Sequence, residues 1–319
     1  MRRRKITIDV FGFSRGATAA RHFVSLMHAK IPLAAQLGFP DAEIIIKFVG
    51  VFDTVSSYGV GIGFGSDVDG LGLDLGSVPK KMVHLVAGNE YRQNFSVTDI
   101  TSSIQAGVGY ELVLPGVHSD VGGSYGELTE EEERHLFDEE RLTLIEQGWY
   151  RPEEISRTSH PVYDPEIGQL LCTTHQSVGH RCDLTWEYQF IALGLMADYA
   201  AKSQMELTDF VEDFQKYALP ADHALQPVQQ VIVKQAGNHG QQGRHVLCFP
   251  GDPILPFENG PIPAPKPEPV AVSLEVARRT RNRYLHRSAS TGILGLNDGR
   301  PGMAERRLEH QPHRLVFAG

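Results

Sequence analysis

The chain has 319 residues, 41% of which are hydrophobic, and a formal net charge of -9 at pH 7. This composition is typical of a globular protein that is long enough to bury a large core. The acidic balance argues against a dedicated nucleic-acid binder, because phosphate binding requires clustered Lys and Arg. The three cysteines show no paired spacing, so the sequence predicts no disulfide framework and no metal site. No cofactor is expected either.

The first predicted element is a β-strand over residues 6–11, where β-branched residues dominate. The sequence Gly-Phe-Ser-Arg-Gly follows at 12–16, and apolar residues then recur at helical spacing over 17–29. A strand, a G-x-S-x-G turn and a helix in this order are typical of a nucleophile elbow, which exposes a catalytic serine. The sequence therefore makes Ser14 the leading candidate for a nucleophile.

Two further strands are predicted to end at residues that can perform chemistry. Residues 43–52 form a β-branched run that is typical of a strand buried on both faces, and this run ends at Asp53. Residues 111–114 predict another strand, which leads into a glycine-containing loop around His118. Between them, apolar residues over 80–94 recur at helical spacing and predict a helix. Ligands gather at the carboxyl ends of parallel strands, so both side chains are expected near a site.

The second half of the chain carries weaker signals. Residues 127–146 are strongly acidic and predict an exposed helix that begins an insertion or lid. Residues 183–205 show the apolar spacing of an amphipathic helix.

These patterns divide the chain into four parts. Residues 1–126 are expected to form the catalytic core, and residues 127–249 a helical insertion or lid with returning core elements. Residues 250–269 are rich in proline and predict a linker outside helix and sheet core. Residues 270–319 form a basic C-terminal segment, which we interpret as a solvated end of the chain, with contact to an anionic surface as the alternative.

A serine hydroxyl is a poor nucleophile at neutral pH, so it requires a base in hydrogen-bond reach and an acid that orients this base. Ser14, Asp53 and His118 occur in the chain order expected for an α/β-hydrolase. Two alternatives stay open: Asp120 as an acid that orients the histidine or caps a turn, and His286 as a later catalytic histidine. His118 ranks first because the glycines around it suit a tight active-site loop.

At these residues the sequence resembles a known family. The main matches are residues 12–17, 51–55 and 115–123, and further matches lie at 84–95 and 284–288. These motifs are similar to those of the first family of type VI secretion system lipase effectors, which have an α/β-hydrolase-like domain. The resemblance runs from about residue 6 to residue 290 and is loose between 127 and 250.

The resemblance implies an α/β fold with a mostly parallel sheet, flanking helices and a helical insertion. It also implies a serine esterase of the phospholipase A type, which hydrolyses acyl esters of membrane glycerophospholipids and acts as an antibacterial toxin. Carried onto this sequence, Ser14 is the nucleophile, Asp53 the orienting acid and His118 the general base. The backbone N–H of Arg15 is then an oxyanion-hole donor.

The resemblance further implies where the protein acts and with what. Its expected partners are the phospholipid membrane of a target cell, a secretion-spike protein and an immunity protein, with no nucleic acid. It is expected to be cytoplasmic in the producing cell and delivered to the periplasm of target bacteria. No signal peptide is predicted, because Asp9 interrupts the apolar stretch behind the basic residues 2–5.

One departure from the family pattern concerns the N-terminal side. Family members carry further strands and an Asp-Gly-Thr motif before the elbow. We therefore expect an incomplete sheet, an open edge at Ile6, Ile8 and Val10, and a missing oxyanion donor.

Two rival functions stay open. One is a truncated, weakly active or inactive remnant that serves as a protein-binding module, and the other is an α/β-hydrolase for another ester.

Overall fold

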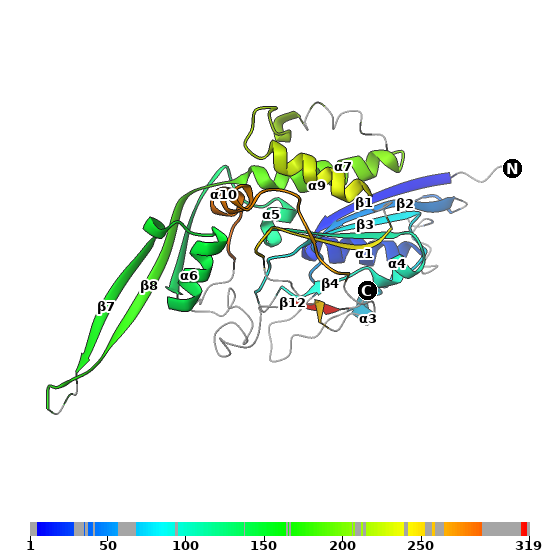
Figure 1. Ribbon diagram of the computed structural model, residues 1–319. Helices are drawn as coiled ribbons and strands as arrows, with labels where there is room; N and C mark the ends of the chain where they lie inside the picture. The colour runs from blue at the N-terminus through cyan, green and yellow to red at the C-terminus, as the bar shows by residue number, and fades with distance from the viewer. Residues whose placement is uncertain are drawn as a thin grey trace.

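The computed structural model describes residues 5–28, 35, 38–40, 42–56, 68–92, 95–136, 138–163, 165, 167–205, 207, 212, 215–238, 242–252, 257–258, 265–288 and 314–317. Its centre is a six-stranded parallel sheet with helices against both faces (Figure 1). From edge to edge the strands are β1 (Lys5–Phe13), β2 (Glu43–Phe52), β3 (Lys81–Ala87), β5 (Gly109–Leu114), β9 (Gly243–Cys248) and β11 (Glu268–Pro269). This architecture confirms the predicted α/β fold with its mostly parallel sheet.

Two apolar layers hold the sheet between its helices. The covering helices are α1 (Arg15–His28), α4 (Thr101–Gln105), α7 (Gln189–Lys202) and α9 (Gln226–Asn238). Val49 and Met82 are buried in the layer that includes α1, whereas Phe48 and Val83 are buried in the layer that includes α7 and α9 (Figure 1). Burying an apolar side chain of this kind stabilises the fold by about 1.5–3 kcal/mol. Two-sided burial therefore fixes the strands whose ends carry the site.

The elbow strand β1 lies at an edge of the sheet. Among the described residues it pairs with β2 alone, in parallel register from Lys5 opposite Glu43 to Phe13 opposite Phe52. Its apolar residues Ile6, Ile8 and Val10 are only half-buried. The predicted open edge at these residues is therefore present in the described part of the chain.

Several elements agree with the sequence prediction. The strands β1, β2 and β5 and the helix α1 lie where the predicted strands and helix do, within one or two residues at most ends. These elements carry the nucleophile elbow and the two strand ends that precede Asp53 and His118.

The predicted helix over 80–94 is wrong, because its first half is strand β3. This strand lies between β2 and β5, and all its residues after Lys81 are buried. A strand that is apolar on both faces has no alternation of polar and apolar residues, so its pattern is easily mistaken for a buried helix.

The predicted acidic helix over 127–146 is also wrong in its first half. The strand β6 (Leu128–Leu136) comes first, and the helix α6 (Asp138–Gln147) follows. The helix predicted over 183–205 is shorter than expected, because β8 (Leu170–Thr185) continues into this range before α7 begins. Strand pairing decides both cases, since β6 and β8 form an antiparallel ladder.

The insertion predicted to be helical therefore also contains a sheet. The strands β6 and β8 pair with β7 (Ile155–Tyr163) in a three-stranded antiparallel sheet. The β7–β8 hairpin projects from the body as an arm (Figure 1). Almost every side chain of β7 is exposed, so the arm is held by its backbone ladder rather than by a core.

The proline-rich segment 250–269 is not entirely outside the sheets, which corrects the linker prediction. The strand β11 pairs with β9 at the sheet edge, where a proline without an N–H is tolerated. A small sheet joins β10 (Phe257–Glu258), β12 (Arg314–Phe317) and β4 (Val97–Thr98). Further α-helices in the described part of the chain are α3 (Val68–Leu71), α5 (His118–Gly122) and α10 (Leu274–Tyr284).

Most of the basic C-terminal segment, residues 289–313, lies outside the described residues. Within the described part of the chain, no helix has both the length and the apolar character needed to cross a bilayer.

Candidate active site

Ser14 lies in a strained turn between β1 and α1. Its φ angle of 58° is in the left-handed region, which costs a residue with a side chain about 1–2 kcal/mol. The turn is fixed by hydrogen bonds from Ser14 N to the Phe52 carbonyl at 3.0 Å and from Ala17 N to the Ser14 carbonyl at 3.0 Å. A strained serine on a strand-to-helix turn is the geometry of a nucleophile elbow.

The two glycines of the elbow differ in what they make possible. A Cβ atom on Gly12 would lie 2.4 Å from the Gly16 carbonyl oxygen, so this position requires glycine. A Cβ atom on Gly16 would meet no atom within 4 Å. The close approach in this turn is therefore made at the first glycine.

Asp53 follows β2 and is fully buried, with a φ angle of 40°. Its Oδ2 lies 2.5 Å from His118 Nδ1, and its Oδ1 accepts a hydrogen bond from Ala87 N at 2.9 Å. The second bond fixes the carboxylate against the end of β3. Asp53 therefore orients the His118 ring and leaves Nε2 as the ring atom that can act as a base.

His118 begins α5 at the end of β5. Its ring packs between Phe13 and Phe95, with centroid distances of 4.4 Å and 4.9 Å. Phe13 directly precedes Ser14 and also fits against Gly122, where a Cβ atom would lie 1.9 Å from the Phe13 ring. This packing brings the elbow strand against α5. No hydrogen bond joins Ser14 and His118, although both are described residues; unliganded active sites often show such loose contacts.

The alternative residues Asp120 and His286 pair with each other rather than with His118 or Asp53. His286 Nδ1 lies 2.7 Å from Asp120 Oδ1, and its Nε2 lies 3.2 Å from Thr129 Oγ1. The ring stacks on Tyr125 at a centroid distance of 3.4 Å.

The predicted oxyanion donor, the backbone N–H of Arg15, lies at the first residue of α1. The first backbone N–H groups of a helix have no partner within the helix, so this position suits an oxyanion donor.

Residues 285–288, which we call the strap, hold the loop of His118 through buried carboxylates. His286 N donates to Asp120 Oδ2 at 3.1 Å, and Ser288 Oγ donates to Glu90 Oε2 at 2.8 Å. The same two oxygens accept hydrogen bonds from Val117 N and His118 N, at 3.0 Å and 3.2 Å. From the sequence, the motif 284–288 offered His286 as an alternative catalytic histidine. The contacts of the strap were not predicted, because the strap and the loop are far apart in sequence.

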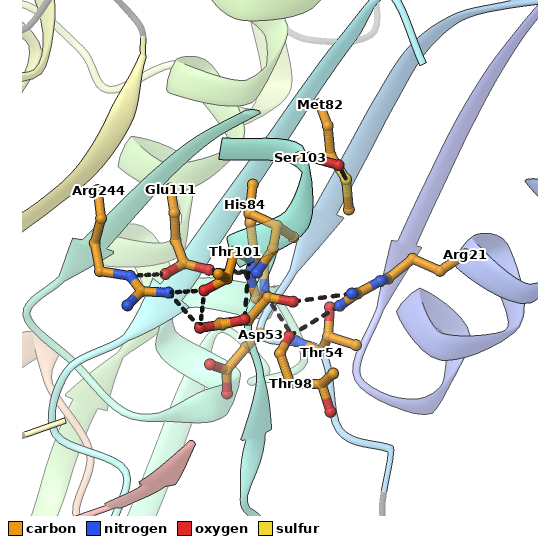
Figure 2. Close-up of polar contacts among 12 residues, drawn as sticks. Arg21, Asp53, Thr54, Met82, His84, Thr98, Thr101, Ser103, Glu111 and Arg244 are labelled. Carbon is orange, nitrogen blue, oxygen red and sulfur yellow. Dashed lines mark hydrogen bonds and ion pairs between the residues drawn. The ribbon is translucent and has the colours of Figure 1, made fainter. Parts of the chain in front are cut away.

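A buried polar network supports the strand ends beneath the site (Figure 2). His84 accepts a hydrogen bond from Thr54 N at 3.1 Å through Nε2 and lies 2.9 Å from Glu111 Oε2 through Nδ1. Arg244 pairs with Glu111 and, at 2.5 Å, with Asp99. Burial acts to raise the pKa of Glu111, but the Arg244 charge and the His84 hydrogen bond outweigh it and lower that pKa to about 2. This network ties the backbone next to Asp53 to three neighbouring strands.

Arg21 on α1 completes the support from the other layer (Figure 2). Its fully buried guanidinium donates to the carbonyls of Leu73, Thr98 and Asp99 at 2.7–3.2 Å. Burial lowers the pKa of Arg21 to about 10, because nearby carboxylates compensate only in part. These bonds anchor the helix that follows Ser14.

The parallel sheet, the strained serine turn and the histidine–carboxylate pair define an α/β-hydrolase-like protein. Residues 33–150 match the family model described as the catalytic domain of Tle1-like phospholipase effectors of the type VI secretion system. This match confirms the resemblance predicted from the sequence. The matched region contains Asp53 and His118 and begins after Ser14.

A solved structure of the Tle1 effector bound to the VgrG spike of the type VI secretion system is similar in fold, with a TM-score of 0.60 and 21% identity. The match covers 99% of this chain and 68% of that chain. An uncharacterized protein from Pseudomonas aeruginosa has a TM-score of 0.38 and 19% identity, over 87% of this chain and 30% of its own. No curated protein matches the chain in sequence.

Proposed function

We propose that this protein is a serine esterase that hydrolyses acyl esters of membrane glycerophospholipids through Ser14, His118 and Asp53. The observation that carries the proposal is the buried contact of 2.5 Å between Asp53 Oδ2 and His118 Nδ1, beside the strained turn of Ser14. A carboxylate on one ring nitrogen directs the other nitrogen toward proton transfer. The match of residues 33–150 to a phospholipase effector model supports the substrate class.

In the proposed reaction, His118 Nε2 takes the proton of Ser14 Oγ while this oxygen attacks the ester carbonyl carbon. Asp53 stabilises the imidazolium that forms. The backbone N–H of Arg15 donates to the oxyanion of the tetrahedral intermediate. His118 then protonates the leaving alcohol, and a water molecule activated by the same nitrogen releases the fatty acid from Ser14.

The proposed setting is antibacterial: a secreted toxin that reaches the periplasm of target bacteria and acts on their membranes. A secretion-spike protein is the proposed carrier, which is supported by the fold shared with an effector solved on such a spike. An immunity protein in the producing strain is a further proposed partner.

The decisive test is labelling by a fluorophosphonate probe, followed by turnover of phospholipid vesicles and of short-chain esters. We expect Ser14→Ala to abolish labelling and vesicle hydrolysis, because it removes the attacking hydroxyl. Ser124→Ala is the matched control, since this exposed hydroxyl lies close to α5 and bonds only to Ser119 among the described contacts.

Three outcomes separate the rival functions. Absence of labelling in the folded parent protein would favour a protein-binding remnant. Labelling with turnover of short esters but not of phospholipids would favour another ester substrate. Labelling of Ser14→Ala at the parental rate would exclude Ser14 as the nucleophile.

A further inference from the structure

A cluster of metal-binding side chains lies on the antiparallel sheet, outside the candidate active site. Glu130 on β6 and His180 and Cys182 on β8 bring one donor atom each to within 4.8 Å of one another. His180 Nε2 lies 2.5 Å from Glu130 Oε1, and Cys182 Sγ lies 3.7 Å from the ring nitrogens of His180. The cluster is at the surface, with the His180 side chain 43% exposed.

The pairing of two strands creates this cluster, which is why cysteine spacing in the sequence does not predict it. His180 and Cys182 are two residues apart on β8 and therefore point to the same face. The ladder between β6 and β8 shifts register between Thr129 and Glu131. This irregularity places Glu130 on the face of His180 and Cys182, while Glu131 pairs with the buried Arg181 on the other face.

The separation between Cys182 Sγ and His180 Nε2 fits a tetrahedral metal ion. Typical Zn–S and Zn–N bonds place the two donors about 3.6 Å apart in tetrahedral geometry. The observed distance from Cys182 Sγ to His180 Nε2 is 3.7 Å. The Glu130 carboxylate would have to move about 1 Å away from His180 to reach the position of a third ligand around the ion. This movement is feasible because the Glu130 side chain is 68% exposed.

The chemistry of the donors selects the ion. A thiolate, an imidazole and a carboxylate are ligands of Zn²⁺, whereas Mg²⁺ and Ca²⁺ prefer oxygen ligands alone. We propose that Glu130, His180 and Cys182 bind one Zn²⁺ ion, with water as the fourth ligand. Binding releases the thiol proton of Cys182 to solvent and replaces the hydrogen bond between Glu130 and His180.

The consequence of the site lies on the other face of the same strands. Arg181 donates to the carbonyls of Arg281 and Leu285 at 3.1 Å and 3.0 Å, and Glu131 accepts from Arg287 N at 3.0 Å. A metal ion that links β6 to β8 holds Glu131 and Arg181 in register. The site therefore stabilises the base of the arm and the two side chains, Glu131 and Arg181, that hold the strap. This effect is independent of the proposed esterase reaction.

Cobalt substitution tests the site directly, because Co²⁺ occupies zinc sites and a Co²⁺–thiolate bond gives a charge-transfer absorption band. We expect the band in the parent protein and in Cys172→Ser, and its removal by added Zn²⁺. Cys172 is the matched control, since it is exposed on the same strand, ten residues from Cys182. Cys182→Ser should lose the band, and His180→Ala should weaken Co²⁺ binding at least tenfold.

Thiol modification in the Cys172→Ser background gives a second readout that requires no spectroscopic assignment. Zn²⁺ should slow the reaction of Cys182 with a disulfide reagent at least tenfold, and His180→Ala should remove this protection. Circular dichroism verifies that each variant is folded. The proposal is overturned if folded parent protein shows no Co²⁺ band, if the band persists in Cys182→Ser, or if Zn²⁺ leaves the Cys182 rate unchanged.

Discussion

The carboxylate of Asp120 holds His286 with both of its oxygens. Oδ1 lies 2.7 Å from the ring Nδ1, and Oδ2 accepts the His286 backbone N–H at 3.1 Å. Oδ2 also accepts the N–H of Val117, which directly precedes His118. One buried carboxylate therefore joins the strap to the loop of the proposed general base.

This relationship predicts that Asp120 acts on the reaction by positioning the His118 loop. Asp120→Asn replaces a charged acceptor, and we expect the free energy of unfolding to fall by about 1.5–3 kcal/mol. We expect kcat to fall more than KM changes, because a displaced base slows the chemical step rather than binding. An unchanged kcat in a folded variant would show that the strap is structural only.

Asp53→Asn is expected to lower kcat by about ten-thousandfold, as in a serine hydrolase whose orienting acid becomes an amide. The amide keeps an oxygen that can accept the N–H of Ala87, so the fold should be retained. Steady-state kinetics and a thermal melt of the same sample check both parts. Equal loss from Asp120→Asn and Asp53→Asn would leave the acid of the triad unassigned between them.

Because the backbone at Ser14 is strained, we expect two inactive variants at this position to differ in stability. Its φ angle of 58° suits glycine, so we expect Ser14→Gly to be about 1 kcal/mol more stable than Ser14→Ala while both are inactive. Chemical denaturation of the two variants measures the difference. Equal stability would mean that the elbow relaxes in solution to an unstrained backbone.

The contact between Gly122 and Phe13 predicts that a side chain at position 122 disturbs the packing of Phe13 against α5. Gly122→Ala places a Cβ atom 1.9 Å from the Phe13 ring, so we expect a loss of about 1–3 kcal/mol in stability and lower esterase activity. Gly126→Ala is the control, because a Cβ atom there would meet nothing within 4 Å. Similar effects from both substitutions would refute a specific role for the contact between Phe13 and α5.

The lowered pKa of the buried Glu111 predicts that the protein loses stability in acid. Burial tends to raise its pKa, yet Arg244 and His84 lower it to about 2, below the ordinary value of 4.5. Between these two values the unfolded chain binds more protons than the folded one, so stability rises with pH. The contribution is present above about pH 4.5 and is lost as the pH falls toward 2.

Urea unfolding at several pH values checks this prediction against Glu111→Gln. The variant should be less stable near pH 7, because Arg244 loses one of the two buried carboxylates that it pairs with. Its stability should change less between pH 4.5 and 2 than that of the parent. Parallel pH profiles would place the acid-sensitive group elsewhere.

Local sequence patterns were sufficient for the elements that carry the proposed triad. The elbow is a short-range feature, because the strand of residues 6–11, the glycines around Ser14 and the helix after it are adjacent in the chain. The run over 43–52 was recognisable for a similar reason, since its β-branched residues are continuous.

Patterns failed where burial or pairing came from distant residues. The sequence of β3 resembles that of a helix because both faces of the strand are buried. The sequence of β6 resembles that of a helix because its acidic residues show no alternation with apolar ones. The pairing of β6 with β8 depends on a backbone ladder that no local propensity encodes.

The sequence by itself determined the residue types and the chain order of Ser14, Asp53 and His118, because motifs and strand ends are local. Only the tertiary structure decided which acid meets which histidine. Asp53 and His118 are separated by 65 residues, and Asp120 and His286 by 166 residues. Sequence spacing carries no information on such contacts; the order of the parallel strands and the path of the strap bring each pair together.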